Sequence, residues 1–113
     1  VDLDALEAAL RAGPPALVCL MAANNETGVL HPLPEVAVLC RAAGAILHVD
    51  AVQAAGRLTM TLDRLGADSL AISGHKLGGP KGAGALVLRP GLHPAATLPG
   101  GGQERGRRGG TEP

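Results

Sequence analysis

The chain has 113 residues, of which 46% are hydrophobic and 18% are charged, and its formal net charge is zero. This length suits one domain or part of a larger one, and the apolar content is sufficient for a packed core. Zero net charge argues against bulk attraction to nucleic acid or to an anionic membrane, and no apolar run reaches the ~18 residues needed to span a bilayer.

The first predicted elements are a helix and a buried strand. Residues 2–12 carry apolar side chains on one helical face, Asp2 or Asp4 can cap the start, and Gly13-Pro14 ends the helix. Residues 16–22 form a continuous apolar run, which predicts a strand buried on both faces.

The next predicted elements are a second helix and a second strand. Pro34 suits the first turn of a helix that runs to Ala43, with Gly44 as its C-cap. Residues 46–49 then predict another buried strand, which ends at Asp50.

The second half of the chain predicts mainly strands and loop. A short helical turn is expected at 63–66, a strand at 69–72 ending at Ser73, and a fourth strand at 84–89 that can pair antiparallel. From Pro99 the chain is rich in glycine and arginine and is expected to be loop. The alternation of buried strands and helices predicts an α/β fold with a mostly parallel sheet flanked by helices.

Polar side chains follow three of the predicted strands. Asn24-Asn25, Asp50 and the run Ser73-Gly74-His75-Lys76 each lie at or just after the carboxyl end of a strand. Open α/β sheets bind ligands at that edge. The sequence therefore predicts a site built from an amide, a carboxylate and a Ser/His/Lys cluster.

Two of these residues have distinct chemical possibilities. A lysine such as Lys76 can form an imine with an aldehyde when its neighbours lower its pKa, but it can equally be a surface lysine in a turn, as we expect for Lys81. Asp50 follows a strand that should be buried, so its carboxylate needs a partner, and a cationic pyridinium nitrogen would serve. Asp50 can also cap a helical turn over residues 51–55, and the two roles are compatible.

Other polar groups allow anion binding. The Ser73 hydroxyl and the His75 imidazole can bind a phosphate, although a turn-forming serine and a structural histidine are equally open. Residues 100–111 hold three arginines among glycines and can be either a phosphate- or RNA-binding loop or a solvated one. Without aromatic residues to stack on bases, nucleic acid is not an expected partner.

The two cysteines do not belong to a metal-binding or redox motif. Cys19 and Cys40 lie inside apolar runs, with neither CxxC spacing nor histidines at metal-ligand spacing. We expect both to be small buried hydrophobic residues in a reducing compartment, the cytoplasm, and we expect no metal site.

Four motifs, in this order and at this spacing, resemble those of the cysteine desulfurases and selenocysteine lyases of the class V aminotransferase family, which use pyridoxal 5'-phosphate (PLP). They are Ala-Asn-Asn-Glu-Thr-Gly at 23–28, His-Val-Asp-Ala-Val-Gln at 48–53, Ser-Gly-His-Lys-Leu-Gly-Gly-Pro-Lys-Gly at 73–82, and Gly-Gly-Gly-Gln-Glu-Arg-Gly-Arg-Arg-Gly-Gly-Thr at 100–111.

The resemblance implies a role for each residue near the cofactor ring. Lys76 resembles the lysine that holds PLP as a Schiff base and acts as the catalytic base. Asp50 resembles the partner of the pyridine nitrogen. Asn25 and Gln53 resemble the residues near the phenolic oxygen of the ring.

Further roles concern the phosphate group and the quaternary structure. Ser73 and His75 resemble phosphate ligands. Thr111 resembles a threonine that reaches the phosphate of the neighbouring subunit's cofactor, which implies a homodimer with Arg105 to Arg108 at its interface.

The implied reaction removes sulfur from L-cysteine, giving L-alanine and an enzyme persulfide for iron-sulfur cluster assembly or other sulfur-acceptor proteins. Selenocysteine lyase or another class V enzyme is the alternative reading, and a non-enzymatic binding module using the basic loop is a remote one. Residues 1–113 would then be the central part of a fold type I large domain, without its N-terminal part and its small domain. Both ends look cut, and the nucleophilic cysteine and the substrate-binding arginine are expected outside this chain.

Overall fold

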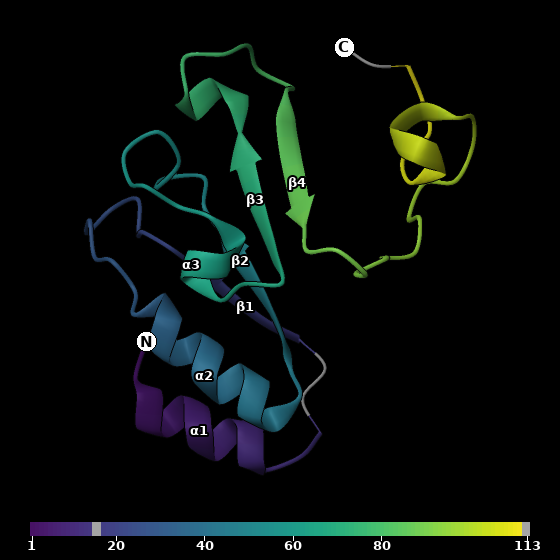
Figure 1. Cartoon of the computed structure of the whole chain (residues 1–113). Helices are drawn as coiled ribbons and strands as arrows, with labels where there is room; N and C mark the ends of the chain where they lie inside the picture. Colours follow the sequence, from purple (N-terminus) through teal and green to yellow (C-terminus); the bar gives the residue numbers. More distant parts are fainter. Residues whose placement is uncertain (15–16, 112–113) are drawn as a thin grey trace.

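The structure is a computed structural model that describes residues 1–14 and 17–111 (Figure 1). Helices and strands alternate until the last strand, as the sequence predicts. They are α1 (Leu3–Arg11), β1 (Leu17–Met21), α2 (Leu33–Ala43), β2 (Ile46–Asp50), α3 (Leu62–Leu65), β3 (Ser69–Ser73), the 3-10 turn η1 (Gly74–Lys76), β4 (Gly84–Leu88) and the 3-10 turn η2 (Gln103–Gly106).

The four strands form one sheet in the order β1-β2-β3-β4. β1, β2 and β3 are parallel, whereas β4 pairs antiparallel with β3. The predicted α/β class and the antiparallel fourth strand are therefore confirmed. Ala16, the first apolar residue of the run assigned to the first strand, lies outside the described residues.

Local sequence signals set the helix ends. The Asp2 carboxylate accepts a hydrogen bond from the Ala5 amide at 3.0 Å at the start of α1. Gly44 ends α2 in the left-handed conformation, with φ at 71°. Thr61 caps α3 through a 3.1 Å bond from the Arg64 amide. None of the helices within residues 1–14 and 17–111 is long and apolar enough to cross a membrane.

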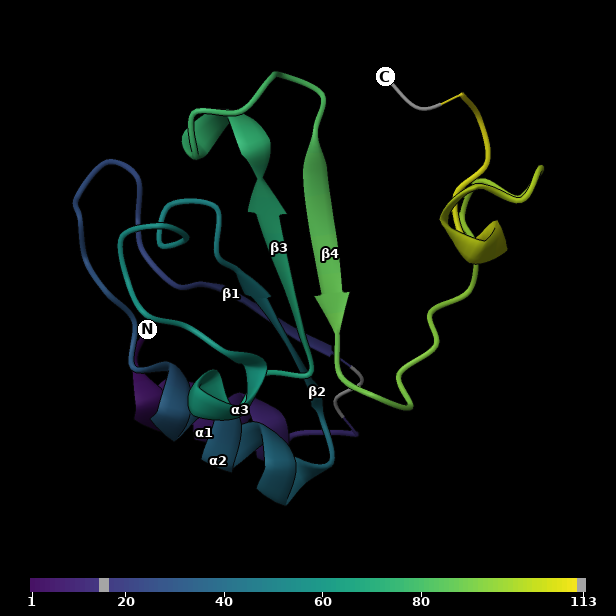
Figure 2. The same ribbon diagram turned by 45° about the horizontal axis from the view of Figure 1, so that its top comes forward.

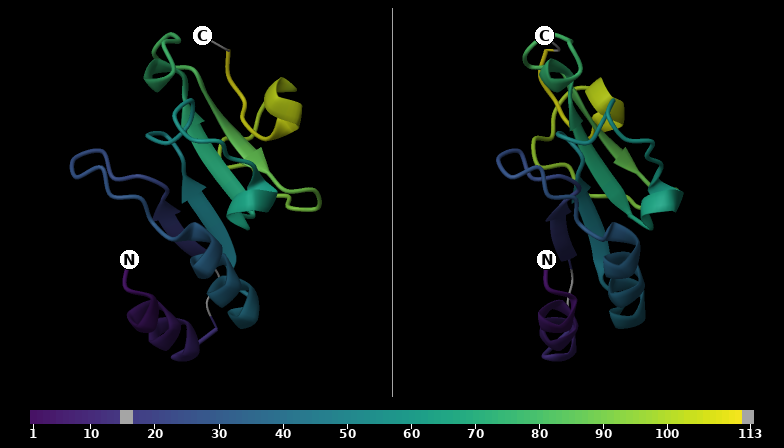
Figure 3. Two further views of the ribbon diagram at one scale, coloured as in Figure 1. Left: turned by 60° about the vertical axis from the view of Figure 1, so that its left-hand side comes forward. Right: turned by 90° about the vertical axis from the view of Figure 1, so that its left-hand side faces the viewer.

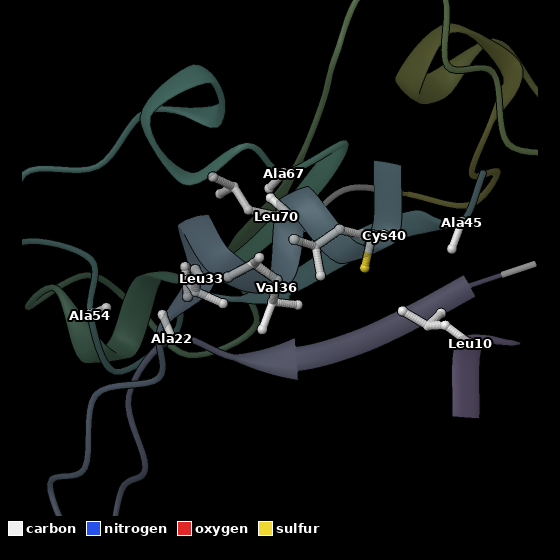
Figure 4. Packing of buried hydrophobic residues seen from close by; sticks show 13 residues of the cluster. Leu10, Ala22, Leu33, Val36, Cys40, Ala45, Ala54, Ala67 and Leu70 are labelled. Atoms are coloured by element: carbon white, nitrogen blue, oxygen red, sulfur yellow. The ribbon is translucent and has the colours of Figure 1, made fainter. Parts of the chain in front are cut away.

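The hydrophobic core lies between the helices and one face of the sheet (Figure 4). Val36 and Cys40 of α2 pack there with Leu47 and Val49 of β2, and each of the four is at most 2% exposed. α1 and α2 lie side by side at the β1–β2 end of the molecule, and the segment after β4 stands apart from them (Figures 2 and 3).

The prediction that the first strand is buried on both faces is wrong within the described chain. Alternate side chains of β1 point to opposite faces, and only the face of Val18 and Leu20 packs against the core. On the other face Leu17 is 57% exposed and Cys19 is also exposed. No described helix covers that face, so the expectation of a buried Cys19 is also wrong, whereas that of a buried Cys40 is confirmed.

Candidate functional site

The parallel strands bring the predicted site residues to one edge of the sheet. Met21 pairs with Asp50 and Asp50 pairs with Ala71, so β1, β2 and β3 end near the same level. The ladder continues past the strand ends, because Ala22 donates to the carbonyl of Asp50 at 2.8 Å and Ala51 to that of Ala71 at 2.9 Å. The loops that follow these strands therefore start from a rigid platform.

Lys76 lies in the 3-10 turn that follows β3, near the top of the sheet in Figure 1. The turn is tied down at Gly74, whose amide donates to the Ala83 carbonyl at 2.8 Å. The Gly74 carbonyl in turn accepts from the amides of Leu77 and Gly79, both at 2.9 Å. Lys76 is exposed, and no hydrogen bond or ion pair within residues 1–14 and 17–111 engages its amine. The amine is therefore accessible to a ligand.

Ser73 and His75 form a polar pair beside this lysine. The Ser73 hydroxyl lies 2.7 Å from Nδ1 of His75. If the hydroxyl donates to Nδ1, the ring proton sits on Nε2, and that N–H is directed away from Ser73. The pair can therefore offer a donor to an anion at the strand end.

The Asp50 carboxylate caps the turn that follows β2. Its Oδ1 accepts from the Val52 amide at 3.0 Å, and the amides of Ala54 and Ala55 donate to the Ala51 carbonyl at 3.0 and 2.9 Å. The side chain is exposed on the open face of the sheet, so the expectation that burial forces it to find a partner is not met in the described chain. Its capping role leaves Oδ2 available for a cationic ligand.

Asn25 and Gln53 lie in the loops on either side of Asp50. Asn25 is exposed, and no hydrogen bond in the described residues uses its side chain. Gln53 is half-buried, and its backbone carbonyl accepts from the Arg57 guanidinium at 3.0 Å. Both side-chain amides can thus contact a ligand at this edge.

The glycine- and arginine-rich segment is not packed into this site. It holds the η2 turn, where Glu104 and Arg105 have left-handed φ angles of 49° and 57°, which are costly for residues other than glycine. A groove of about 960 Å³ separates this segment from β4, and Thr111 and Arg105 are among the residues that line it. Neither Ser73 nor His75 is among the residues that line this groove.

A second cavity, of about 410 Å³, lies at the opposite edge of the sheet. It is next to Cys40, whose pKa is raised first by burial of the thiol and then by the Asp68 carboxylate. Asp68 is held by a 2.9 Å ion pair with Arg89 and by the Leu47 amide, which donates to it at 2.7 Å. These contacts tie β2 to β3 and β4 at the edge away from Lys76.

Known proteins resemble this chain along its whole length. The family model described as aminotransferase class V matches residues 1–108. Cysteine desulfurase 2 of Trichormus variabilis is 54% identical over 112 residues, which are 99% of this chain and 28% of that protein. Cysteine desulfurase IscS of Salmonella arizonae is 48% identical over 115 residues, covering 100% of this chain and 28% of that protein. The chain thus spans little more than a quarter of the length of these relatives.

Solved structures also resemble this chain in their fold. A NifS-like protein from Rickettsia africae superposes with a TM-score of 0.94 at 39% identity, covering 99% of this chain and 32% of that one. A protein described as SspA in complex with cysteine superposes with a TM-score of 0.88 at 34% identity, covering 100% of this chain and 33% of that one.

Proposed function

The chain belongs to the class V aminotransferase family, and from this premise we propose that it is the central part of a PLP-dependent cysteine desulfurase. The observation that carries the proposal is the placement of Lys76. Its unengaged amine follows β3 directly, beside the Ser73–His75 pair and at the same sheet edge as the Asp50 carboxylate. Relatives named cysteine desulfurase and a structural neighbour described with cysteine support this assignment.

The residues at the sheet edge fit PLP in number and charge. An amine is required for the aldehyde, a carboxylate for the pyridinium nitrogen, and hydrogen-bond donors for the phosphate. We assign these roles to Lys76, to Asp50, and to Ser73 with His75, and we place Asn25 and Gln53 near the ring oxygen. PLP, when bound, withdraws the electrons left on a substrate carbon after a proton is removed.

The chain's own residues then have defined tasks. The Asp50 carboxylate would hold the ring nitrogen in its protonated form through a charge-assisted hydrogen bond. The Lys76 amine would hold the cofactor and, when it is free, would accept the proton from Cα of L-cysteine. A thiolate of the enzyme takes the substrate sulfur, so that the carbon–sulfur bond breaks, a sulfur–sulfur bond forms, and protonation of the remaining carbon skeleton gives L-alanine.

Neither cysteine of this chain suits the thiolate role. Cys40 is 2% exposed, and burial raises its pKa, which disfavours the thiolate. Cys19 lies in the middle of β1, in a strand held by pairing with β2. We therefore place the nucleophilic cysteine in another part of the protein, where it can also pass sulfur to acceptor proteins.

A homodimer would complete the site. Thr111 and Arg105 line the groove beside β4, and none of the other proposed site residues line it. We propose that Thr111 reaches the phosphate of the partner subunit's cofactor, and that the arginines of residues 105–108 lie at the subunit interface.

The test uses the full-length protein with PLP, assayed for alanine and sulfide release from L-cysteine in the presence of a thiol. We expect turnover that Lys76→Ala abolishes and that the matched variant Lys81→Ala retains. Reduction with borohydride should leave the pyridoxyl group on the peptide that contains Lys76. A label on Lys81, or none, would contradict the assignment. Turnover of L-selenocysteine without turnover of L-cysteine would instead favour a selenocysteine lyase.

A further inference from the structure

Two identical side chains, Asn24 and Asn25, follow β1 but have opposite environments. Asn24 is half-buried and uses both its amide oxygen and its amide nitrogen in contacts within the chain. Asn25 is exposed, and its side chain makes no hydrogen bond in the described part of the chain. The Asn24 side chain is thus bonded within the protein, whereas the Asn25 side chain is available to a ligand.

The Asn24 amide oxygen is the centre of the loop. It accepts from the Glu26 amide at 3.0 Å, from the Thr27 amide at 2.9 Å and from the Thr27 hydroxyl at 3.1 Å. A backbone N–H can only donate, so these two amides require the oxygen of Asn24, not its nitrogen, at this position. The Thr27 hydroxyl also accepts from the Val29 amide at 3.4 Å, which extends the network along the loop.

Other contacts of Asn24 close the loop at its base. Its nitrogen donates to the sulfur of Met21 at 3.4 Å, which ties the side chain to the end of β1. Its backbone amide donates to the Val29 carbonyl at 2.9 Å, and its carbonyl accepts from the Gly28 amide at 3.1 Å. Gly28 has a left-handed φ of 71°, which lets the chain turn back here. The side chain and the backbone of Asn24 therefore hold residues 24–29 in one conformation.

We infer that Asn24 is a positioning residue that fixes this loop so that the Asn25 amide is already directed to the cofactor when PLP binds. This inference rests on the proposed function. Without the three bonds to the Asn24 oxygen, the loop would have to be ordered at the moment of binding, and that ordering reduces affinity. The Asn24 oxygen is occupied by three bonds within the loop and its nitrogen is tied to Met21, so we expect its effect on PLP to pass through Asn25.

The chain offers a matched pair of variants to test this. Asn24→Asp keeps an oxygen for all three bonds and loses only the donor to Met21. Asn24→Leu has a similar size and loses every side-chain bond. Two measurements on the full-length protein are compared: hydrogen–deuterium exchange of the Glu26 and Thr27 amides in the PLP-free protein, and PLP affinity by absorbance titration.

We expect Asn24→Leu to speed exchange of these two amides by about tenfold or more, because each loses its only acceptor, and to weaken PLP affinity by about tenfold. Asn24→Asp should stay within about threefold of the wild type in both measurements. Asn25→Ala should weaken PLP affinity without changing the exchange of either amide. If Asn24→Leu fails to fold, Thr27→Val removes one of the three bonds and should give a smaller change in the same direction.

Equal effects of Asn24→Asp and Asn24→Leu would overturn the inference, and so would normal PLP affinity in a variant whose loop amides exchange fast. A wild-type protein that takes up no PLP would defeat the proposed function instead. In that event the exchange data alone would still show whether Asn24 orders the loop.

Discussion

The Asp50 carboxylate caps a turn, and we propose that it also contacts the ring nitrogen of the cofactor. Oδ1 accepts from the Val52 amide at 3.0 Å and so caps the turn after β2, while Oδ2 remains available at the sheet edge. The cap needs only an acceptor, whereas the proposed ring contact needs a negative charge. A substitution by a neutral isostere can therefore separate the two roles.

We predict that Asp50→Asn keeps the stability of the full-length protein but loses most turnover. Asparagine retains the acceptor for Val52, whereas it lacks the negative charge that would favour the protonated ring nitrogen. A charge-assisted hydrogen bond contributes about 1.5–3 kcal/mol, which corresponds to a loss of roughly ten- to a hundredfold. Thermal unfolding and alanine production are the two measurements. Near-normal turnover in Asp50→Asn would show that Asp50 is only a cap.

Cys40 makes the free energy of unfolding depend on pH. Because burial raises the pKa of its thiol in the folded protein, the unfolded chain loses this proton at a lower pH than the folded one. The contribution of the protonated Cys40 thiol to the free energy of unfolding is complete below the pKa of the thiol in the unfolded chain, about 8.5. It declines as the pH rises from there toward the pKa of the thiol in the folded protein. We expect the unfolding free energy of full-length Cys40→Ala, measured by urea denaturation, to decline less steeply with pH over this range than that of the wild type. Parallel pH profiles for the two proteins would contradict the prediction.

The element that carries Lys76 depends on small residues at the turn between β3 and β4. A Cβ added to Gly84 would lie 2.9 Å from the Ile72 carbonyl oxygen, and one added to Gly74 would lie 3.1 Å from that of Ala83. The two chain segments therefore approach closely only because these residues lack side chains. This close approach fixes the start of β4 against β3 and, with it, the turn that presents Lys76.

We predict that Gly84→Ala destabilises the full-length protein by about 1–3 kcal/mol, because backbone must move away from backbone. PLP incorporation should fall as well, since the displaced turn includes Lys76. Gly13→Ala is the matched control, because a Cβ at Gly13 meets no atom of residues 1–14 or 17–111 within 4 Å and its φ is not left-handed. Unfolding midpoints and the absorbance of bound PLP measure the two effects. Equal behaviour of the two variants would refute the packing argument.

At the scale of the whole molecule, the helices protect only part of the sheet. On the open face Leu17 is 57% exposed and Leu86 is 55% exposed, and β4 is an edge strand. Parallel sheets in proteins are normally covered on both faces, and exposed apolar edges promote aggregation. The 113 residues taken alone thus expose apolar side chains to water, which is unfavourable.

We predict that the isolated chain is poorly soluble and that it does not turn over L-cysteine when PLP is added. It holds the lysine, the carboxylate and the serine–histidine pair of the proposed site, but neither of its two cysteines suits the nucleophile, and we propose that Thr111 serves the partner subunit's site. Light scattering and an assay of alanine and sulfide test the two parts. Sustained alanine release that disappears in Lys76→Ala would prove the second part wrong.

The sequence alone determined the element order and the position of the candidate site residues at the strand ends. Largely apolar runs mark β1, β2 and β3, and the polar residues that follow these runs lie at the strand ends. Parallel pairing then gathers those ends at one edge, so Asp50 and Lys76 were predictable from local patterns and the spacing of the four motifs.

Only the tertiary structure decided which side chains are covered and which bonds they make. Cys19 and Cys40 lie in similar apolar runs, yet one is exposed and the other buried, because α2 packs on only one face of the sheet. Asn24 and Asn25 are the same amino acid, and the fold of their loop gives the first one every internal bond. Burial and hydrogen bonding depend on what packs across from a residue, and a local pattern does not contain that information.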